Sequence, residues 1–362
     1  MRRLLPLLAL LLSVAAPARA QQAATLDSLA QAFFEEQESM GMVVGVVTPD
    51  GRRVRSHGQV GLRKKAAPDE ASLFEAGSIT KVLTALLLAD MARSGEVTLD
   101  DPIGRYLPDS VNAPTYEGQP ITLKQLATHT SGLPRLPTNL APTNIADPYA
   151  DYTAADLHSF LDDYELRRAP GSQYEYSNLG GGLLGHLLAR AADASYGTLV
   201  ERRVLEPLGM DDSYVAGVDS ASLAGRGDLV PGYGPTRSAS PWHFDALAGA
   251  GGLRSTARDL LALLSAQIGL SEAGLRPAMQ STQAVQYKAS GERPSLGLAW
   301  HVSRRDGRRL YWHNGGTGGF RGFIGFEPET QTGLVVLANS ALPVTMFTQF
   351  GLRALTRAGG ER

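Results

Sequence analysis

Two side chains that could form a nucleophile and its base stand three residues apart, at Ser78 and Lys81. The apolar residues that follow predict a helix over 78–93, so this spacing places both side chains on one face of its first turn. A serine hydroxyl becomes an effective nucleophile when a neighbouring base takes its proton. A lysine in a dry helix start has a lowered pKa, and it can serve as that base or assist it. For this motif alone, a capping serine before a solvated lysine stays an open alternative.

A second motif, Tyr176-Ser177-Asn178, is expected on a loop ahead of a helix predicted over 180–192. A nearby lysine cation stabilises the anion of a phenol, so Tyr176 could exchange protons with a serine or a leaving group. The amide of Asn178 could donate a hydrogen bond to a substrate carbonyl. An Asn before Gly is also common in ordinary turns, so this motif is weak by itself.

The third motif, residues 312–320, ends a predicted strand and carries the candidate binding residues His313, Asn314, Gly315 and Gly316. Glycines let a strand edge lie against the backbone of a ligand, and the amide of Gly316 could complete an oxyanion hole. The alternative is a flexible glycine turn that follows a surface histidine.

These motifs require a scaffold that joins distant parts of the chain. Strands are predicted over 42–47, 53–61, 296–303, 308–313, 320–326 and 332–338, with hairpin turns between successive pairs. Helices are predicted over 24–36, 78–93, 122–129, 153–164, 180–192, 256–267 and 344–358. We therefore expect an α/β (α+β) fold, in which an antiparallel sheet from both chain ends is flanked by helices and a mostly helical region is inserted between them. A site would lie in the cleft between the two regions.

The first twenty residues predict a signal peptide. Arg2 and Arg3 precede an apolar run over 4–14, and Ala18-Arg19-Ala20 forms a cleavage pattern. The run is too short to span a bilayer. We expect a secreted or periplasmic protein, cleaved near Ala20, with no membrane span. Residues 21–362 would form one catalytic domain, with an α/β part at about 21–77 and 280–362 and a helical insert at about 78–279.

Composition and missing motifs exclude several other classes. The chain has 34 basic and 36 acidic residues, a net charge of −2 and no basic stripe, which argues against a nucleic-acid partner. It has no cysteine, and its seven histidines show no metal-binding spacing, so we predict neither metal nor cofactor. No serine stands in Gly-x-Ser-x-Gly, as an α/β-hydrolase would need. Residues 180–185 fit Gly-x-Gly-x-x-Gly but follow a polar loop rather than a strand. We expect a monomer that acts on a small-molecule substrate.

Each of the three motifs occurs once, and in this order the sequence resembles the serine β-lactamase and penicillin-binding peptidase superfamily, specifically its class C β-lactamase-like branch. The neighbouring segments 126–134, 207–210 and 251–256 match as well, and the resemblance covers essentially the whole chain after residue 20. It implies an acyl-transfer enzyme in which Ser78 attacks a carbonyl with help from Lys81 and Tyr176. The amides of Ser78 and Gly316 would hold the oxyanion, and Asn178 would orient the substrate amide. The identity of the base stays open.

One departure bears on the substrate. Class C β-lactamases carry Lys where this chain has His313, and Thr where it has Asn314. A histidine with an ordinary pKa near 6.5 carries only part of a positive charge at neutral pH, which weakens the recognition of a substrate carboxylate. The histidine version resembles certain D-Ala-directed peptidases, D-aminopeptidases and esterases. We expect β-lactam hydrolysis first. A D-Ala-type carboxypeptidase or D-aminopeptidase, a carboxylesterase, and a penicillin-binding sensor without turnover are the alternatives.

Overall fold

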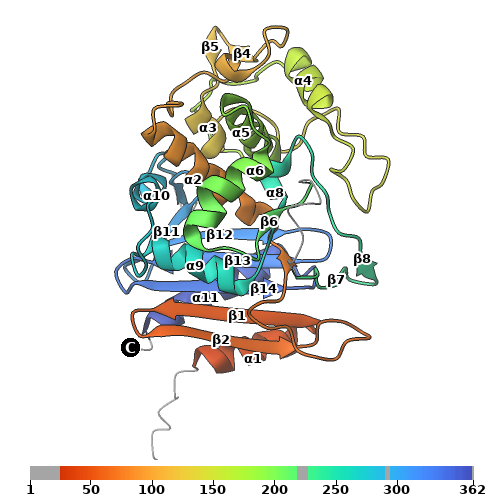
Figure 1. Ribbon diagram of the computed structural model, residues 1–362, viewed down its shortest axis with the longest axis vertical. Helices are drawn as coiled ribbons and strands as arrows, with labels where there is room; N and C mark the ends of the chain where they lie inside the picture. Colours follow the sequence, from red (N-terminus) through yellow and green to blue (C-terminus); the bar gives the residue numbers. More distant parts are fainter. Residues whose placement is uncertain (1–24, 218–226, 290–293, 361–362) are drawn as a thin grey trace, which may run out of the picture.

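The computed structural model describes residues 25–217, 227–289 and 294–360, so the predicted signal peptide lies outside the described residues. In this part of the chain, seven strands form one antiparallel sheet in the order β10-β11-β12-β13-β14-β1-β2. The strands are β1 (Gly41–Thr48), β2 (Gly51–Gly58), β10 (Ser295–Leu296), β11 (His301–Arg305), β12 (Arg308–Gly316), β13 (Arg321–Glu327) and β14 (Thr332–Ala338). Because β1 pairs with β14, the two ends of the chain meet in one sheet, as predicted (Figure 1).

One strand prediction, 296–303, is wrong at its centre. Strand β10 ends at Leu296 and β11 begins at His301. Between them the chain makes a tight turn in which Ala299 has a φ of 60° and the amide of Gly297 donates to the carbonyl of Trp300 at 2.9 Å. The amide of Ala299 then donates to the carbonyl of Ala127 at 3.0 Å. The apolar residues of this segment therefore leave the sheet and tie it to the helical region.

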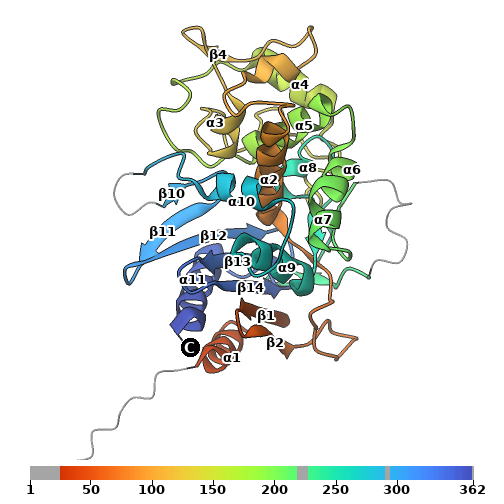
Figure 2. The same ribbon diagram turned by 60° about the vertical axis from the view of Figure 1, so that its left-hand side comes forward.

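Helices cover both faces of the sheet. Helices α1 (Leu26–Glu36) and α11 (Val344–Gly360) lie together on one face, while α9 (Ala257–Gln267) covers the other (Figure 2). Side chains alternate between the faces along a strand. In β1, Val44 and Val46 accordingly belong to the core beneath α1 and α11, and Val43 belongs to the core on the α9 side. Fully burying each such side chain contributes about 1.5–3 kcal/mol.

The helical region lies above the sheet in Figure 1, with α2 (Thr80–Arg93) between the two. The other helices of this region are α3 (Leu123–Ala127), α4 (Ala154–Asp163), α5 (Asn178–Ala191), α6 (Tyr196–Val200), α7 (Glu206–Leu208), α8 (Ala248–Gly251) and α10 (Arg276–Gln283). Helix α2 is buried on nearly every side, as its apolar sequence requires. Helix α9 falls in the same stretch of sequence, yet it packs on β1 and β14 of the sheet.

Short elements connect these parts. They are β3 (Phe74–Glu75), β4 (Thr115–Tyr116), β5 (Gln119–Pro120), β6 (Tyr214–Val215), β7 (Gly232–Tyr233), β8 (Ser238–Ala239), β9 (Leu253–Ser255), the 3₁₀ turns η1 (Gly77–Ile79) and η2 (Ile103–Tyr106), and the π-helical turn η3 (Glu201–Leu205). Strand β9 pairs with β3 and β6, which fixes the chain just before η1.

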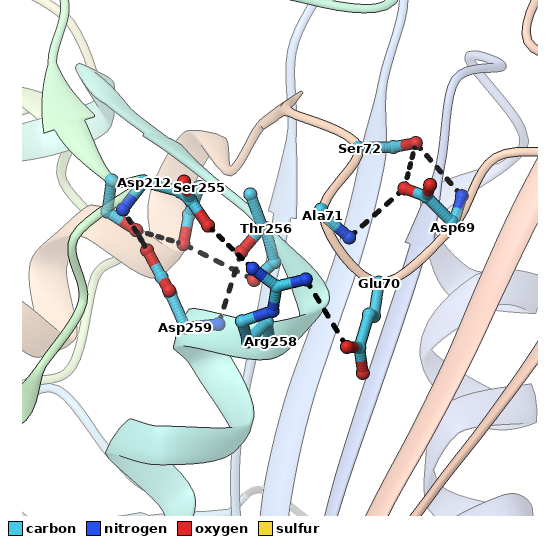
Figure 3. Close-up of polar contacts among 10 residues, drawn as sticks. Asp69, Glu70, Ala71, Ser72, Asp212, Ser255, Thr256, Arg258 and Asp259 are labelled. Atoms are coloured by element: carbon cyan, nitrogen blue, oxygen red, sulfur yellow. Dashed lines mark hydrogen bonds and ion pairs between the residues drawn. The ribbon is translucent and has the colours of Figure 1, made fainter. Parts of the chain in front are cut away.

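The start of α9 is held by a buried polar cluster, shown in Figure 3. Thr256 caps the helix, and its hydroxyl accepts from the amide of Asp259 at 3.2 Å. The Asp259 carboxylate accepts from the hydroxyl of Ser213 at 2.7 Å and from the amide of Asp212 at 3.0 Å. Ser213 also bonds the Ser255 hydroxyl at 2.7 Å. Burial raises the pKa of Asp259 to about 6.

Candidate active site

Ser78 lies in the 3₁₀ turn η1, immediately before α2. Its side chain is partly exposed although both chain neighbours, Gly77 and Ile79, are buried. It lines a pocket of about 440 Å³, a size typical of small-molecule sites. Gly77 adopts a φ of +52°, a left-handed conformation that suits glycine. The turn therefore presents one hydroxyl to the pocket from an otherwise buried segment.

Lys81 is buried directly beneath this serine. Its Nζ lies 3.2 Å from Ser78 Oγ, 3.0 Å from Asn178 Oδ1 and 2.7 Å from the carbonyl oxygen of Ala250. Burial, and then the charge of Arg135, lower the pKa of Lys81 well below its usual value. The predicted same-face geometry of Ser78 and Lys81 is therefore present, and the environment favours the neutral amine.

Tyr176 and Asn178 reach the same point from the start of α5. The Ser177 hydroxyl caps this helix by accepting from the amide of Gly180 at 2.8 Å, so Asn178 is its first residue rather than part of a loop. Tyr176 lines the pocket together with Ser78, and Lys81 Nζ lies 5.1 Å from the centre of its ring. Burial raises the pKa of Tyr176 above its usual value, so its hydroxyl stays protonated at neutral pH.

The end of β12 forms another wall of the same pocket. Strand β11 pairs with β12 only up to Trp312, so residues 313–316 have no strand partner on that side in the part of the chain that the structure describes. A side-chain carbon on Gly315 would lie 2.0 Å from the carbonyl oxygen of Ala76, and one on Gly77 would lie 2.7 Å from the amide nitrogen of Gly316. Glycine at these positions lets β12 touch η1, so the Gly316 amide lies beside the segment that carries Ser78.

His313 and Asn314 behave differently from the sequence expectation of a partly charged, ligand-facing pair. His313 is fully buried, and its Nδ1 donates to the carbonyl oxygen of Asn314 at 2.6 Å. Burial, and then the nearby His301 and Lys81, lower the pKa of His313 well below its usual value, so the ring is neutral at pH 7. The Asn314 side chain donates to Thr348 Oγ1 of α11 at 2.7 Å. Asn314 therefore contributes its backbone, rather than its side chain, to the lining of the pocket.

His129 supports the loop that carries Tyr176. Its Nδ1 accepts from the amide of Ser177 at 3.2 Å, and its carbonyl accepts from the amide of Glu175 at 2.8 Å. Its ring lies 4.4 Å from that of Tyr176. These contacts give His129 a structural role beside the pocket.

Several pocket residues escaped the sequence analysis because they come from separate parts of the chain. They are Arg135, Tyr174, Trp242, His301, Trp312, Thr317, Arg321 and Val344. Most stand outside the three motifs, and no spacing rule links them to those motifs. Among the residues outside the motifs, Arg135 alone had a signal in the sequence, because it directly follows the matching segment 126–134.

Two larger hollows lie elsewhere on the described surface. One of about 580 Å³ includes Ser195 and His186, but Ser195 caps α6. The other, of about 690 Å³, is bordered by Ser303 and Arg304 on β11. Neither combines a serine with a buried lysine. Among the described residues no three or more His, Asp or Glu side chains group as metal ligands, and no helix has the length and apolar character to cross a membrane.

The fold and the site define a β-lactamase-like serine hydrolase. The chain belongs to the Beta-lactamase family, whose family model matches residues 26–358. This confirms the resemblance, the fold class and the type of enzyme inferred from the sequence.

The names of individual relatives refer to two kinds of enzyme. The chain is 31% identical to the D-alanyl-D-alanine-carboxypeptidase/endopeptidase AmpH of Escherichia coli, over 89% of this chain and 85% of that protein. It is 27% identical to a beta-lactamase of the same species, over 86% and 87%. Among solved structures, a beta-lactamase/D-alanine carboxypeptidase from Yersinia pestis has a TM-score of 0.81 at 27% identity, covering 92% of this chain and 97% of that one.

Proposed function

We propose that the protein hydrolyses β-lactam amide bonds through an acyl-enzyme formed on Ser78. The observation that carries this proposal is the position of the Lys81 amine, buried and 3.2 Å from the Ser78 hydroxyl. A nucleophile within hydrogen-bond reach of a base with a lowered pKa is the arrangement that acyl transfer by serine requires.

Lys81 is the better candidate for the general base. A neutral amine has two N–H donors and one lone pair. The Asn178 side chain and the Ala250 carbonyl can only accept at these contacts, so they engage both donors. The lone pair is then directed to the Ser78 hydroxyl, whose proton it can take. Tyr176 stays protonated and can pass a proton to the leaving nitrogen, after which it assists the attack of water.

Two further groups would position the substrate. The amides of Ser78 and Gly316 would bind the developing oxyanion, because the close contact between Gly77 and Gly316 brings both segments to one side of the pocket. The Asn178 amide nitrogen carries two hydrogens, while its Oδ1 accepts from Lys81 Nζ at 3.0 Å. The amide hydrogens can donate to the acyl amide of the substrate. Gly315 permits this approach, while His313 and Asn314 support the strand.

Hydrolysis of D-alanyl peptides is the second candidate. It is favoured by the names of the E. coli and Y. pestis relatives. The neutral, buried His313 supplies no ammonium-like charge for the carboxylate of either a β-lactam or a peptide terminus, so it does not separate the two candidates. D-aminopeptidase and carboxylesterase activities use the same acyl-enzyme and differ only in the groups that surround the carbonyl.

Location and assembly complete the proposal. The sequence pattern of the first twenty residues supports cleavage near Ala20 and a secreted or periplasmic mature enzyme. We propose that residues 21–362 act as one catalytic domain and as a monomer. Gel filtration of the mature chain tests the monomeric state.

A panel of substrates tests the activity. Steady-state rates would be measured on a chromogenic cephalosporin, a D-Ala-D-Ala peptide and a short-chain nitrophenyl ester, with the Ser78 adduct of a fluorescent penicillin located by mass spectrometry. We expect an adduct on Ser78 and the fastest turnover on the cephalosporin. Turnover of the peptide alone would establish the second candidate. A folded sample with no adduct on Ser78 would rule out the mechanism.

A further inference from the structure

Arg135 places an uncompensated positive charge in the active-site pocket. Its side chain is exposed, and its guanidinium carbon lies 5.1 Å from the centre of the Tyr176 ring. Other arginines of this protein meet carboxylates, for example Arg203 with Asp90 and Glu96. Among the described residues, Arg135 makes no such ion pair. Its guanidinium therefore retains its hydrogen-bond donors for another partner.

The walls of the pocket provide no acidic partner. The described residues that line it include no Asp or Glu. A second arginine, Arg321, also reaches the pocket, but its guanidinium donates to the carbonyl oxygens of Thr317, Phe320 and Leu342 at 2.6–2.9 Å. Those bonds fix Arg321 as part of the wall. Arg135 is the guanidinium that a ligand can reach and pair with.

The backbone of Arg135 determines which part of a substrate it would meet. Its carbonyl oxygen accepts from the amides of Asn178, at 2.9 Å, and Leu179, at 3.2 Å. Arg135 is therefore held next to Asn178, the residue to which the proposed function gives the acyl amide of the substrate. Its charge also acts on the reacting groups, since it adds to burial in lowering the pKa of Lys81.

We propose that Arg135 binds a carboxylate carried by the acyl part of the substrate, so that the enzyme prefers acyl donors with an acidic group near the scissile carbonyl. This inference rests on the proposed function, because the role of Asn178 defines the acyl side. A guanidinium presents a planar fork that matches a carboxylate, and the cation–π contact with Tyr176 already restricts the Arg135 side chain before a ligand binds. The neutral His313 and the carbonyl-bound Arg321 do not offer this fork.

A matched pair of penicillins tests the inference. Carbenicillin is benzylpenicillin with one additional carboxylate on the acyl side chain. The measured quantity is kcat/KM for carbenicillin divided by kcat/KM for benzylpenicillin, in the wild type, R135Q, R135E and the control R63Q. Arg63 is exposed and does not line the pocket. Where turnover is slow, acylation rates of Ser78 replace kcat/KM. Where β-lactams do not react, 4-nitrophenyl hemisuccinate and 4-nitrophenyl butyrate form the equivalent pair.

We expect R135Q to lower this ratio about tenfold, R135E to lower it further, and R63Q to leave it unchanged, as loss of one charge-assisted contact implies. A purely structural arginine would change both rates together and leave the ratio constant. A ratio in R135Q within about twofold of the wild type would overturn the inference while the proposed function stood. Failure of every substrate to acylate Ser78 would overturn both.

Discussion

Two polar clusters of this protein each surround one buried ionisable side chain but are completed in different ways. Around Asp259, the serines 213 and 255 and the cap of α9 bond one another, and none of these side chains has a buried atom without a partner in the described structure. Around Lys81, ring nitrogens of His129, His301 and His313 are buried without a hydrogen-bond partner among the described residues. A buried group without a partner costs stability, so the cluster around Lys81 is satisfied less completely than the cluster around Asp259.

The difference separates a cluster that holds the fold from one that is prepared for a substrate. In both clusters, burial shifts the pKa of the central residue in the direction that favours its neutral form: it raises the pKa of Asp259 and lowers that of Lys81. Only Lys81 adjoins a hydroxyl that lines a pocket. A shifted pKa therefore indicates catalysis here only together with access to a ligand.

Replacement of Ser78 by alanine has the largest expected effect on activity. Loss of the nucleophile lowers kcat by about 10⁴–10⁶-fold, as in other serine hydrolases. The matched control is Ser195→Ala, which removes the cap of α6 and costs about 1 kcal/mol of stability. Rates and thermal melting of both variants would be compared. Comparable turnover by S78A and the wild type would assign catalysis to a different residue.

Lys81→Met comes next. Removal of the base lowers kcat/KM by about 10²–10⁴-fold. Because the pKa of Lys81 is lowered and the neutral amine is the active form, wild-type activity is present above that pKa and is lost as pH falls through it. We expect the variant to lose this acidic limb of the kcat/KM profile. Lys124→Met, which removes a lysine paired with Asp100, is the control. An unchanged acidic limb in K81M would exclude Lys81 as the base.

Gly315→Ala tests the contact between the sheet and the serine turn. The added carbon would lie 2.0 Å from the Ala76 carbonyl, so β12 must move away from η1 and weaken the oxyanion hole. Loss of one oxyanion donor lowers kcat by about 10²–10³-fold. Gly274→Ala is the control, because nothing lies within 4 Å of the added carbon. Full activity in a stable G315A would show that the close approach is not needed.

Local sequence patterns and the order of the motifs sufficed to predict the sheet and the three segments that carry the candidate site residues. The continuous apolar, β-branched runs of β1 and β14 and the spacing of Ser78 and Lys81 are local properties, so they can be recognised in the sequence. The turn at 297–300 could not be predicted, because a contact with Ala127 overrides its apolar pattern. The neutral state of His313 likewise depends on tertiary burial. Arg135 and Trp242 reach the pocket through loops whose paths no short-range rule determines.

The smallest effect on catalysis is expected at Asp259. D259A should lower the free energy of unfolding by about 1–3 kcal/mol, because the Ser213 hydroxyl and the Asp212 amide lose their acceptor, while kcat/KM stays within about twofold. The folded-state pKa, about 6, exceeds the unfolded value near 3.8. The folded state therefore binds more protons in this range, and the wild type loses stability relative to D259N as pH rises from about 4 to about 6.

Urea unfolding of the wild type, D259A and D259N at pH 4 and pH 7 measures this difference directly. Asparagine retains an acceptor oxygen but cannot ionise, so its stability lacks the contribution of the carboxyl between the two pH values. Equal pH dependence in D259N and the wild type would show that Asp259 does not titrate in this range. A loss of activity in D259A as large as that of K81M, in a folded sample, would place the Asp259 cluster with the catalytic groups and remove the distinction between the two clusters.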